Sequence, residues 1–180
     1  PRPRPQHPMF IDPMSRFAPA FLVLSWVVMG FSFAFFVPMA WDWFGEGGTH
    51  VHVWAWCFAF TLATGAWLWV RTRHANRELT VRDGFLLVTL VWVVLPVYAA
   101  LPLMYAVQGL SFTDAYFEAM SGLTATGATA MAGLDLLAPS VNIWRCFLQL
   151  IGGLGIMLLA VAVLPLLGLG GTQLYKAEMP

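Results

Sequence analysis

The stretch SGLTATGATAMAGLD, residues 121–135, determines how this chain is interpreted. It holds three glycines, three threonines and one carboxylate, Asp135, and long apolar segments lie on either side of it. Small residues of this kind favour exposed, non-helical backbone. Inside a membrane, such backbone is tolerated only where protein surrounds it or where it lines a watery cavity. The role of this stretch is therefore the main question that the sequence raises.

The composition indicates an all-α integral membrane protein. Hydrophobic residues make up 59% of the 180 residues, and charged residues only 10%; the mean hydropathy is +0.74. A soluble domain carries about a quarter charged residues. The net charge is zero, so no nucleic-acid partner is expected. Cys57 and Cys146 lie within apolar runs, and we expect both to be small buried hydrophobic residues without disulfide or metal.

Four segments are long enough to cross a bilayer. A hydrocarbon core about 30 Å thick needs roughly 20 helical residues. Residues 1–16 begin with PRPRPQHP, which is expected to be a flexible cytosolic lead because proline disfavours helix. The predicted spans are residues 17–40, 51–70, 84–107 and 141–167.

The basic residues predict a cytoplasmic N-terminus. With that orientation, all of the nine Lys and Arg residues except Arg145 lie on the cytoplasmic side. The first connection, WDWFGEGGTH at 41–50, carries two acids and no Lys or Arg, as expected for an outside loop. The basic residues assigned to the inside are Arg2, Arg4, Arg16, Arg71, Arg73, Arg77, Arg82 and Lys176.

A short helix is predicted between the third and fourth spans, at residues 112–122. Ser111 is a candidate N-cap with Asp114 three residues later. Apolar residues then recur at helical spacing along one face up to Leu123. Eleven residues reach about 16 Å, half of a membrane. We therefore expect a re-entrant pore helix that enters from outside and is followed by TATGAT, residues 124–129.

Three functions fit this arrangement of residues. The negative end of a helix attracts cations, and backbone carbonyls can replace the hydration shell of an alkali cation. Gly127 permits backbone conformations that other residues avoid, so the segment fits half of an ion-selectivity unit. Small residues also let transmembrane helices pack closely. A discontinuous helix of a secondary transporter has a similar composition.

Catalytic and metal-binding patterns are not apparent in the sequence. No nucleophile–base set or phosphate-binding loop is present, so an enzyme is not expected, and neither is an organic cofactor. His50 and His52 are two residues apart, so on a helix their side chains point in different directions. They make a poor metal pair and are expected to be interfacial residues.

The longer motifs identify a resemblance to a known family. SFTDAYFEAMSGLTATGATAMAGLD (111–135) and WRCFLQLIGGLGIMLLAVAVLPLLGLGGTQLYKAEMP (144–180) resemble the first pore repeat of TrkH-type potassium uptake proteins, in the Trk/Ktr/HKT superfamily. The resemblance implies four covalently linked membrane–pore–membrane repeats in the whole protein. It implies that residues 17–78 are an N-terminal transmembrane helix pair and that residues 79–180 are the first repeat, so that the chain is an N-terminal fragment.

The resemblance also implies a set of ion-binding groups. Potassium ions would be coordinated by the backbone carbonyls of Thr124, Ala125, Thr126, Gly127 and Ala128. Within the superfamily, glycine at the place of Gly127 goes with potassium, and serine goes with sodium. Where the family usually has a third threonine, this chain has Ala125, and little effect is expected because the ligands are carbonyls.

Four further residues are predicted to support this segment. Thr129 is a small neighbour of the filter. Glu118 is expected to form a salt bridge or to hold the filter backbone by hydrogen bonds, because an unpaired buried carboxylate is costly. Arg145 is expected to pair with Glu118 or with Asp135. Asp135 either concentrates cations at the outer mouth, caps a surface turn, or pairs with Arg145.

The implied setting is the bacterial cytoplasmic (inner) membrane. The expected partners are the remaining three pore repeats, a second copy in a homodimer, membrane lipid, and a cytosolic nucleotide-binding regulatory subunit similar to TrkA. Potassium is the transported ion. Two alternatives remain open at this point, a non-conducting structural or assembly fragment and an ion-coupled secondary carrier.

Overall fold

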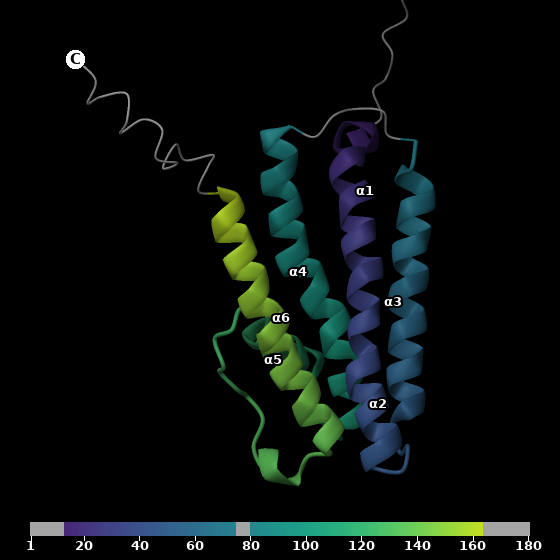
Figure 1. Cartoon of the computed structure of the whole chain (residues 1–180), viewed down its shortest axis with the longest axis vertical. Coiled ribbons are helices and arrows are strands. Elements are labelled where there is room, and N and C mark those ends of the chain that lie inside the picture. Colours follow the sequence, from purple (N-terminus) through teal and green to yellow (C-terminus); the bar gives the residue numbers. More distant parts are fainter. Residues whose placement is uncertain (1–12, 75–79, 164–180) are drawn as a thin grey trace, which may run out of the picture.

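The computed structural model describes residues 13–74 and 80–163, and these residues form an all-helical bundle (Figure 1). Four long helical stretches run side by side, with one short helix, α5, beside them. The four stretches are long and apolar enough to cross a membrane, in agreement with the four predicted spans. They cover Phe17–Gly45, Val51–Thr72, Arg82–Ala106 and Pro139–Leu159.

The first span consists of three consecutive helical pieces: α1 (Pro13–Ser32), the 3-10 helix η1 (Phe33–Phe35) and α2 (Phe36–Gly45). Pro38 has no N–H to donate to the carbonyl four residues before it, and the helix tightens just ahead of this proline. The helix starts four residues before the predicted start of the span at residue 17. A proline is well suited to the first position of a helix, so α1 begins at Pro13. Residues 1–12 lie outside the described part of the chain.

The second and third spans are α3 (Val51–Thr72) and α4 (Val81–Ala106). α4 begins three residues before its predicted start because Thr80 and Asp83 form a capping box. The Thr80 N–H donates to Asp83 Oδ2 at 2.9 Å, and the Asp83 N–H donates to Thr80 Oγ1 at 3.4 Å. α4 continues as one helix through Pro96 and Pro102.

The short helix is α5 (Phe112–Leu123), and it lies in one half of the bundle, packed against α4 and α6 (Figure 1). The predicted N-cap is confirmed, because Ser111 Oγ accepts from the Asp114 N–H at 3.1 Å. A loop containing the 3-10 helix η2 (Leu134–Leu136) returns the chain to α6 (Pro139–Val163). Residues 164–167 of the predicted fourth span and Lys176 lie outside the described residues.

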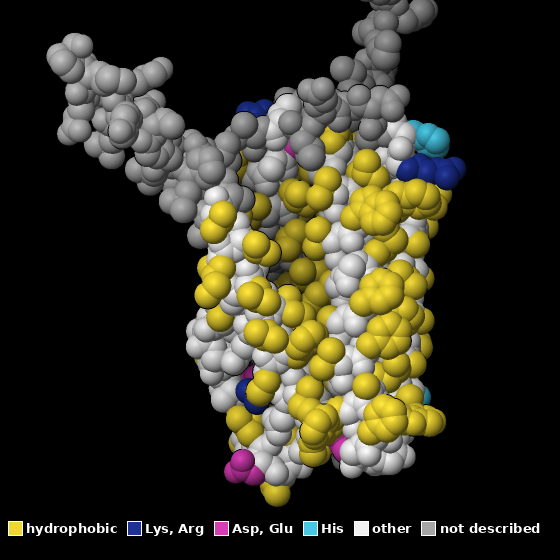
Figure 2. Space-filling view, viewed as in Figure 1, with side chains coloured by type: hydrophobic (Ala, Val, Ile, Leu, Met, Phe, Trp, Pro, Cys, Tyr) yellow, Lys and Arg dark blue, Asp and Glu magenta, His cyan; other side chains and the backbone are white. Residues whose placement is uncertain are grey.

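The charges are sorted between the two ends of the bundle. α1, α3, α4 and α6 alternate in direction, so the start of α1, the end of α3, the start of α4 and the end of α6 share one end (Figure 1). Arg71 and Arg73 end α3 at that end, and Arg82 lies in the first turn of α4. Most charged side chains gather near the two ends, and hydrophobic side chains cover the middle (Figure 2). This pattern suits a bilayer.

The core is centred on the ring of Trp144, on α6. It stacks on Phe35 with ring centroids 4.7 Å apart and meets Trp54 of α3 edge-on at 5.9 Å. Its indole N–H donates to the carbonyl oxygen of Ala99 on α4 at 3.0 Å. One buried side chain thus joins α6 to the other three spans.

The two cysteines differ in their surroundings. Cys57 is buried in the core, as expected. Cys146 is exposed, so the prediction that it is buried was wrong. It lies two residues after Trp144, which is about 200° around a helix, so it faces away from the core that Trp144 enters.

Glycine allows α5 to lie against α6. A Cβ added at Gly152 of α6 would lie 2.0 Å from the carbonyl oxygen of Leu123, the last residue of α5. A Cβ added at Gly122 would lie 3.0 Å from the Cβ of Leu148. The end of α5 is thus seated at a place on α6 where any side chain larger than hydrogen collides with backbone.

We predict that Gly152→Ala destabilises the protein by about 1–3 kcal/mol, the usual cost of overpacking. The matched control is Gly153→Ala, because no atom lies within 4 Å of an added Cβ there. The control should be neutral or slightly stabilising, since alanine is the better helix former. Thermal unfolding in detergent measures both variants. Equal stability of the two would contradict the close contact at Gly152.

Candidate functional site

The helix α5 ends in a tight reversal of the chain. Thr124 donates its N–H to the Met120 carbonyl at 2.9 Å, and Ala125 donates to Gly122 at 2.8 Å. Ala125 then has φ +53° and Gly127 has φ +73°. Left-handed residues commonly follow the last turn of a helix. The chain therefore leaves the α5 axis directly after Thr124 and continues as irregular backbone through residues 126–132.

Ser121 fixes this irregular segment to α5. Its carbonyl accepts the N–H of Thr126 at 2.9 Å, and its hydroxyl donates to the carbonyl of Ala128 at 2.7 Å. The residue is only 5% exposed. Two threonine hydroxyls, those of Thr124 and Thr126, lie 2.8 Å apart. These bonds hold the start of the predicted filter from its α5 side.

Four of the five predicted ion-binding carbonyls are free. In the part of the chain that the structure describes, the carbonyl oxygens of Thr124, Ala125, Thr126 and Gly127 accept no hydrogen bond. The fifth, that of Ala128, accepts from Ser121. Residues 125–130 are exposed. Unused carbonyl oxygens on an accessible segment are suited to cations that have lost their water.

Glu118 holds the other end of the segment. Its Oε1 accepts from the Thr129 hydroxyl, from the Ala130 N–H at 2.6 Å and from the Met131 N–H at 3.3 Å. Its Oε2 accepts from Arg145 Nε of α6 at 3.1 Å. The two backbone donors, Ala130 and Met131, lie directly after the predicted filter at residues 124–129, and Thr129 contributes its side-chain hydroxyl.

The Arg145 side chain pairs with Glu118 and not with Asp135. The Glu118 side chain is 1% exposed and that of Arg145 is 17% exposed. Ion pairs this deeply buried depend on complete hydrogen bonding, and Glu118 has it. Asp135 is exposed in η2, near the end of the bundle where the loop turns back. Its two other predicted roles, concentrating cations and capping a turn, both remain predictions.

Sequence reasoning missed Ser121 and the neighbourhood of Gly127. Serine in a helix usually bonds within its own helix, so the contact of Ser121 with Ala128, seven residues later, is not visible in the sequence. Gly127 has Gln149 of α6 beside it, since an added Cβ would lie 3.7 Å from the Gln149 side-chain nitrogen. Both contacts depend on the reversed path of the chain after α5.

Known proteins are similar to this chain in sequence and in fold. The family model described as TrkH, cation transport protein, matches residues 50–180. The Trk system potassium uptake protein TrkH of Halomonas elongata is 53% identical over 109 residues, which are 60% of this chain and 23% of that protein. TrkH of Escherichia coli K12 is 52% identical over 109 residues, again 60% of this chain and 23% of that protein. The Trk system potassium uptake protein TrkG of the same strain is 44% identical over 110 residues, which are 61% of this chain and 23% of TrkG.

A solved structure agrees in fold. The crystal structure of the potassium transporter TrkH from Vibrio parahaemolyticus matches with a TM-score of 0.79 and 39% identity, covering 87% of this chain and 34% of that one. The chain thus matches about a quarter of the length of its curated relatives. The family model covers well over half of the chain, and the chain therefore belongs to the TrkH family of cation transport proteins.

Proposed function

We propose that residues 124–129, which follow a pore helix at residues 112–122, form one part of a potassium-selective filter in a bacterial potassium uptake system of the inner membrane. The family is one of transporters, not of enzymes. The observation that carries the proposal is the set of four carbonyl oxygens at residues 124–127, which are free of hydrogen bonds within the described residues. The relatives' printed names as potassium uptake proteins support potassium as the ion.

The filter works by exchanging water for carbonyl oxygen. A potassium ion entering from outside loses its hydration shell and gains backbone carbonyls in its place. The negative end of the α5 dipole, at Leu123, points towards the same segment and favours a cation there. Exposed Asp135 adds negative charge on the approach from outside. The potassium ions then move inward, driven by their electrochemical gradient.

The segment supplies one side of a pore. Residues 79–180 act as the first membrane–pore–membrane repeat, and residues 17–78 as the helix pair before it. Three further repeats of the whole transporter complete the ring around the ion. A second copy and a cytosolic nucleotide-binding regulatory subunit similar to TrkA complete the assembly in the lipid membrane. The Lys and Arg bias supports a cytoplasmic N-terminus.

The first prediction for the filter segment concerns Gly127. Gly127→Ser in the whole transporter should lower the preference for potassium over sodium. A side chain at φ +73° costs about 1–2 kcal/mol, which is a factor of about 5–30 in an equilibrium. The measurement is rubidium and sodium uptake in a bacterium that lacks its own potassium uptake systems.

Gly109→Ser is the matched control for Gly127→Ser. Gly109 has φ +79°, no atom within 4 Å of an added Cβ, and a place in the loop before α5. The Gly109→Ser variant carries the same backbone strain outside the filter, so its preference for potassium over sodium should remain that of the unmodified protein. If the Gly127 variant keeps its preference for potassium, residues 124–129 are not the filter.

The second prediction concerns Glu118. Glu118→Gln replaces one acceptor oxygen by a donor, so either the backbone N–H groups or Arg145 lose a partner, at about 1–3 kcal/mol. We expect lower thermal stability together with a lower maximal rate of rubidium uptake. Asp114→Asn, one turn earlier on α5 and bonded only to its cap, is the control. Uptake at the unmodified rate in the Glu118 variant would show that the bonds of Glu118 to residues 129–131 and to Arg145 are not needed for transport.

The third prediction concerns Ser121. Ser121→Ala frees the Ala128 carbonyl and removes one bond, worth about 0.5–1.5 kcal/mol. We expect selectivity to fall while thermal stability changes little. Thr89→Ala, which removes a hydroxyl bonded only to its own helix, should alter neither property. Selectivity equal to that of the unmodified protein would show that Ser121 does not position the filter.

A further inference from the structure

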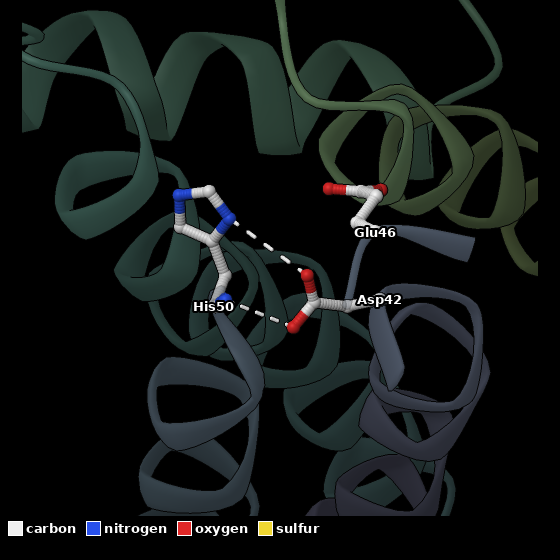
Figure 3. A group of neighbouring side chains, drawn as sticks. All are labelled: Asp42, Glu46 and His50. Carbon is white, nitrogen blue, oxygen red and sulfur yellow. Dashed lines mark hydrogen bonds and ion pairs between the residues drawn. The ribbon is translucent and has the colours of Figure 1, made fainter. Parts of the chain in front are cut away.

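A group of metal-binding side chains lies away from the filter, at the turn between α2 and α3. Asp42 and Glu46 come from α2 and its end, and His50 immediately precedes α3 (Figure 3). One ligand atom from each of the three residues lies within 4.8 Å of the others. Gly47 and Gly48, with φ +73° and +81°, turn the chain so that His50 returns to Asp42. The turn therefore gathers one imidazole and two carboxylates.

The Asp42 carboxylate is held in a fixed orientation. Its Oδ2 accepts the His50 N–H at 2.9 Å, and its Oδ1 lies 3.9 Å from His50 Nδ1 (Figure 3). The Thr49 hydroxyl lies 3.3 Å from Asp42 Oδ1 and 3.2 Å from His50 Nδ1. The ring and the carboxylate oxygen therefore face each other, with a small polar group beside both.

The Glu46 carboxylate is oriented by a different helix. The N–H of Ser140, in the first turn of α6, donates to Glu46 Oε1, and the Ser140 hydroxyl donates to Oε2 at 3.1 Å. Each of the two carboxylates thus has one oxygen held by a backbone N–H. Ligating carboxylates in metal sites are oriented by hydrogen bonds of this kind, which direct their remaining lone pairs to the ion.

Within the described residues, the positive groups that face the two carboxylates are the His50 ring and the N-terminal end of α6, where Ser140 donates to Glu46. Asp42 is 0% exposed, and among the described residues neither Asp42 nor Glu46 has a Lys or Arg partner within 4.0 Å. Within the same part of the chain, the ion pair that Asp42 does form is with the His50 ring, which carries charge only when protonated. A buried carboxylate with a second one beside it favours a bound cation.

We propose that Asp42, Glu46 and His50 bind a divalent transition-metal ion, Zn²⁺, at the outer end of the bundle. One imidazole with two carboxylates is a donor set that zinc accepts, with water completing the four positions. Calcium and magnesium prefer six or more oxygens and fit this set less well. Metal binding replaces the contact between the Thr49 hydroxyl and the ring. Through Glu46 and Ser140, the ion braces the start of α6, the helix that also carries Arg145.

The test is zinc binding to the whole transporter, purified in detergent with an affinity tag that has no histidines and stripped by a chelator. Isothermal titration with Zn²⁺ should show one site per chain. His50→Ala and Glu46→Gln should each weaken that site at least about tenfold, the smallest loss expected even for residues that only orient ligands. Glu46→Gln keeps an oxygen for the Ser140 N–H, so the fold is preserved.

His52→Ala is the matched control, because His52 lies two residues later, in the first turn of α3, is exposed and is outside the group. It should bind zinc as the unmodified protein does. Equal zinc affinity in the His50 and unmodified proteins, a loss in the His52 variant, or displacement of zinc by equimolar Ca²⁺ or Mg²⁺ would overturn the proposal. Because binding is measured without transport, the result is independent of the filter assignment.

Discussion

The arrangement of the candidate filter depends on the buried carboxylate of Glu118. At membrane depth an unpaired carboxylate is costly, and the side chain is 1% exposed. The cost is offset by Arg145 and by donors at residues 129–131. Since these donors belong to α6 and to the returning chain, one charge joins three segments. If one partner is lost, the others are left with a buried charge that is incompletely bonded.

This clamp divides the polar groups of the segment into two sets. The N–H groups of Thr126, Ala130 and Met131 turn towards α5, where Ser121 and Glu118 accept them. The carbonyls of residues 124–127 are left without hydrogen-bond partners among the described residues. Residues 125–127 are exposed and Thr124 is half-buried, so these carbonyl oxygens are accessible to water or to an ion.

The sequence predicted most of what depends on local pattern. Hydropathy located four spans, Ser111 located the start of α5, and the cost of burying Glu118 predicted its hydrogen-bonded state. Features that depend on how distant segments meet were missed. Asp42 and Glu46 are four residues apart on one helix face, which the sequence does show. His50 lies beside these carboxylates because Gly47 and Gly48 reverse the chain. Ser140 contacts Glu46 because α6 begins beside that turn.

The exposure of residues 125–130 carries a consequence for the assembly in the membrane. Irregular backbone with free carbonyls cannot face lipid, because no group there satisfies it. Ala125 sharpens the point, since a non-glycine residue at φ +53° is retained only where its surroundings compensate the strain. The face that presents these carbonyls must therefore border protein or water. In the apolar stretch of each of the four spans, only 22–39% is buried within the described structure. Ample apolar surface therefore remains for lipid on the other faces. A pore shared with further repeats gives the carbonyls a border of protein and water and leaves the apolar faces to lipid. Lipid on all sides suits the apolar faces but leaves the carbonyls unsatisfied.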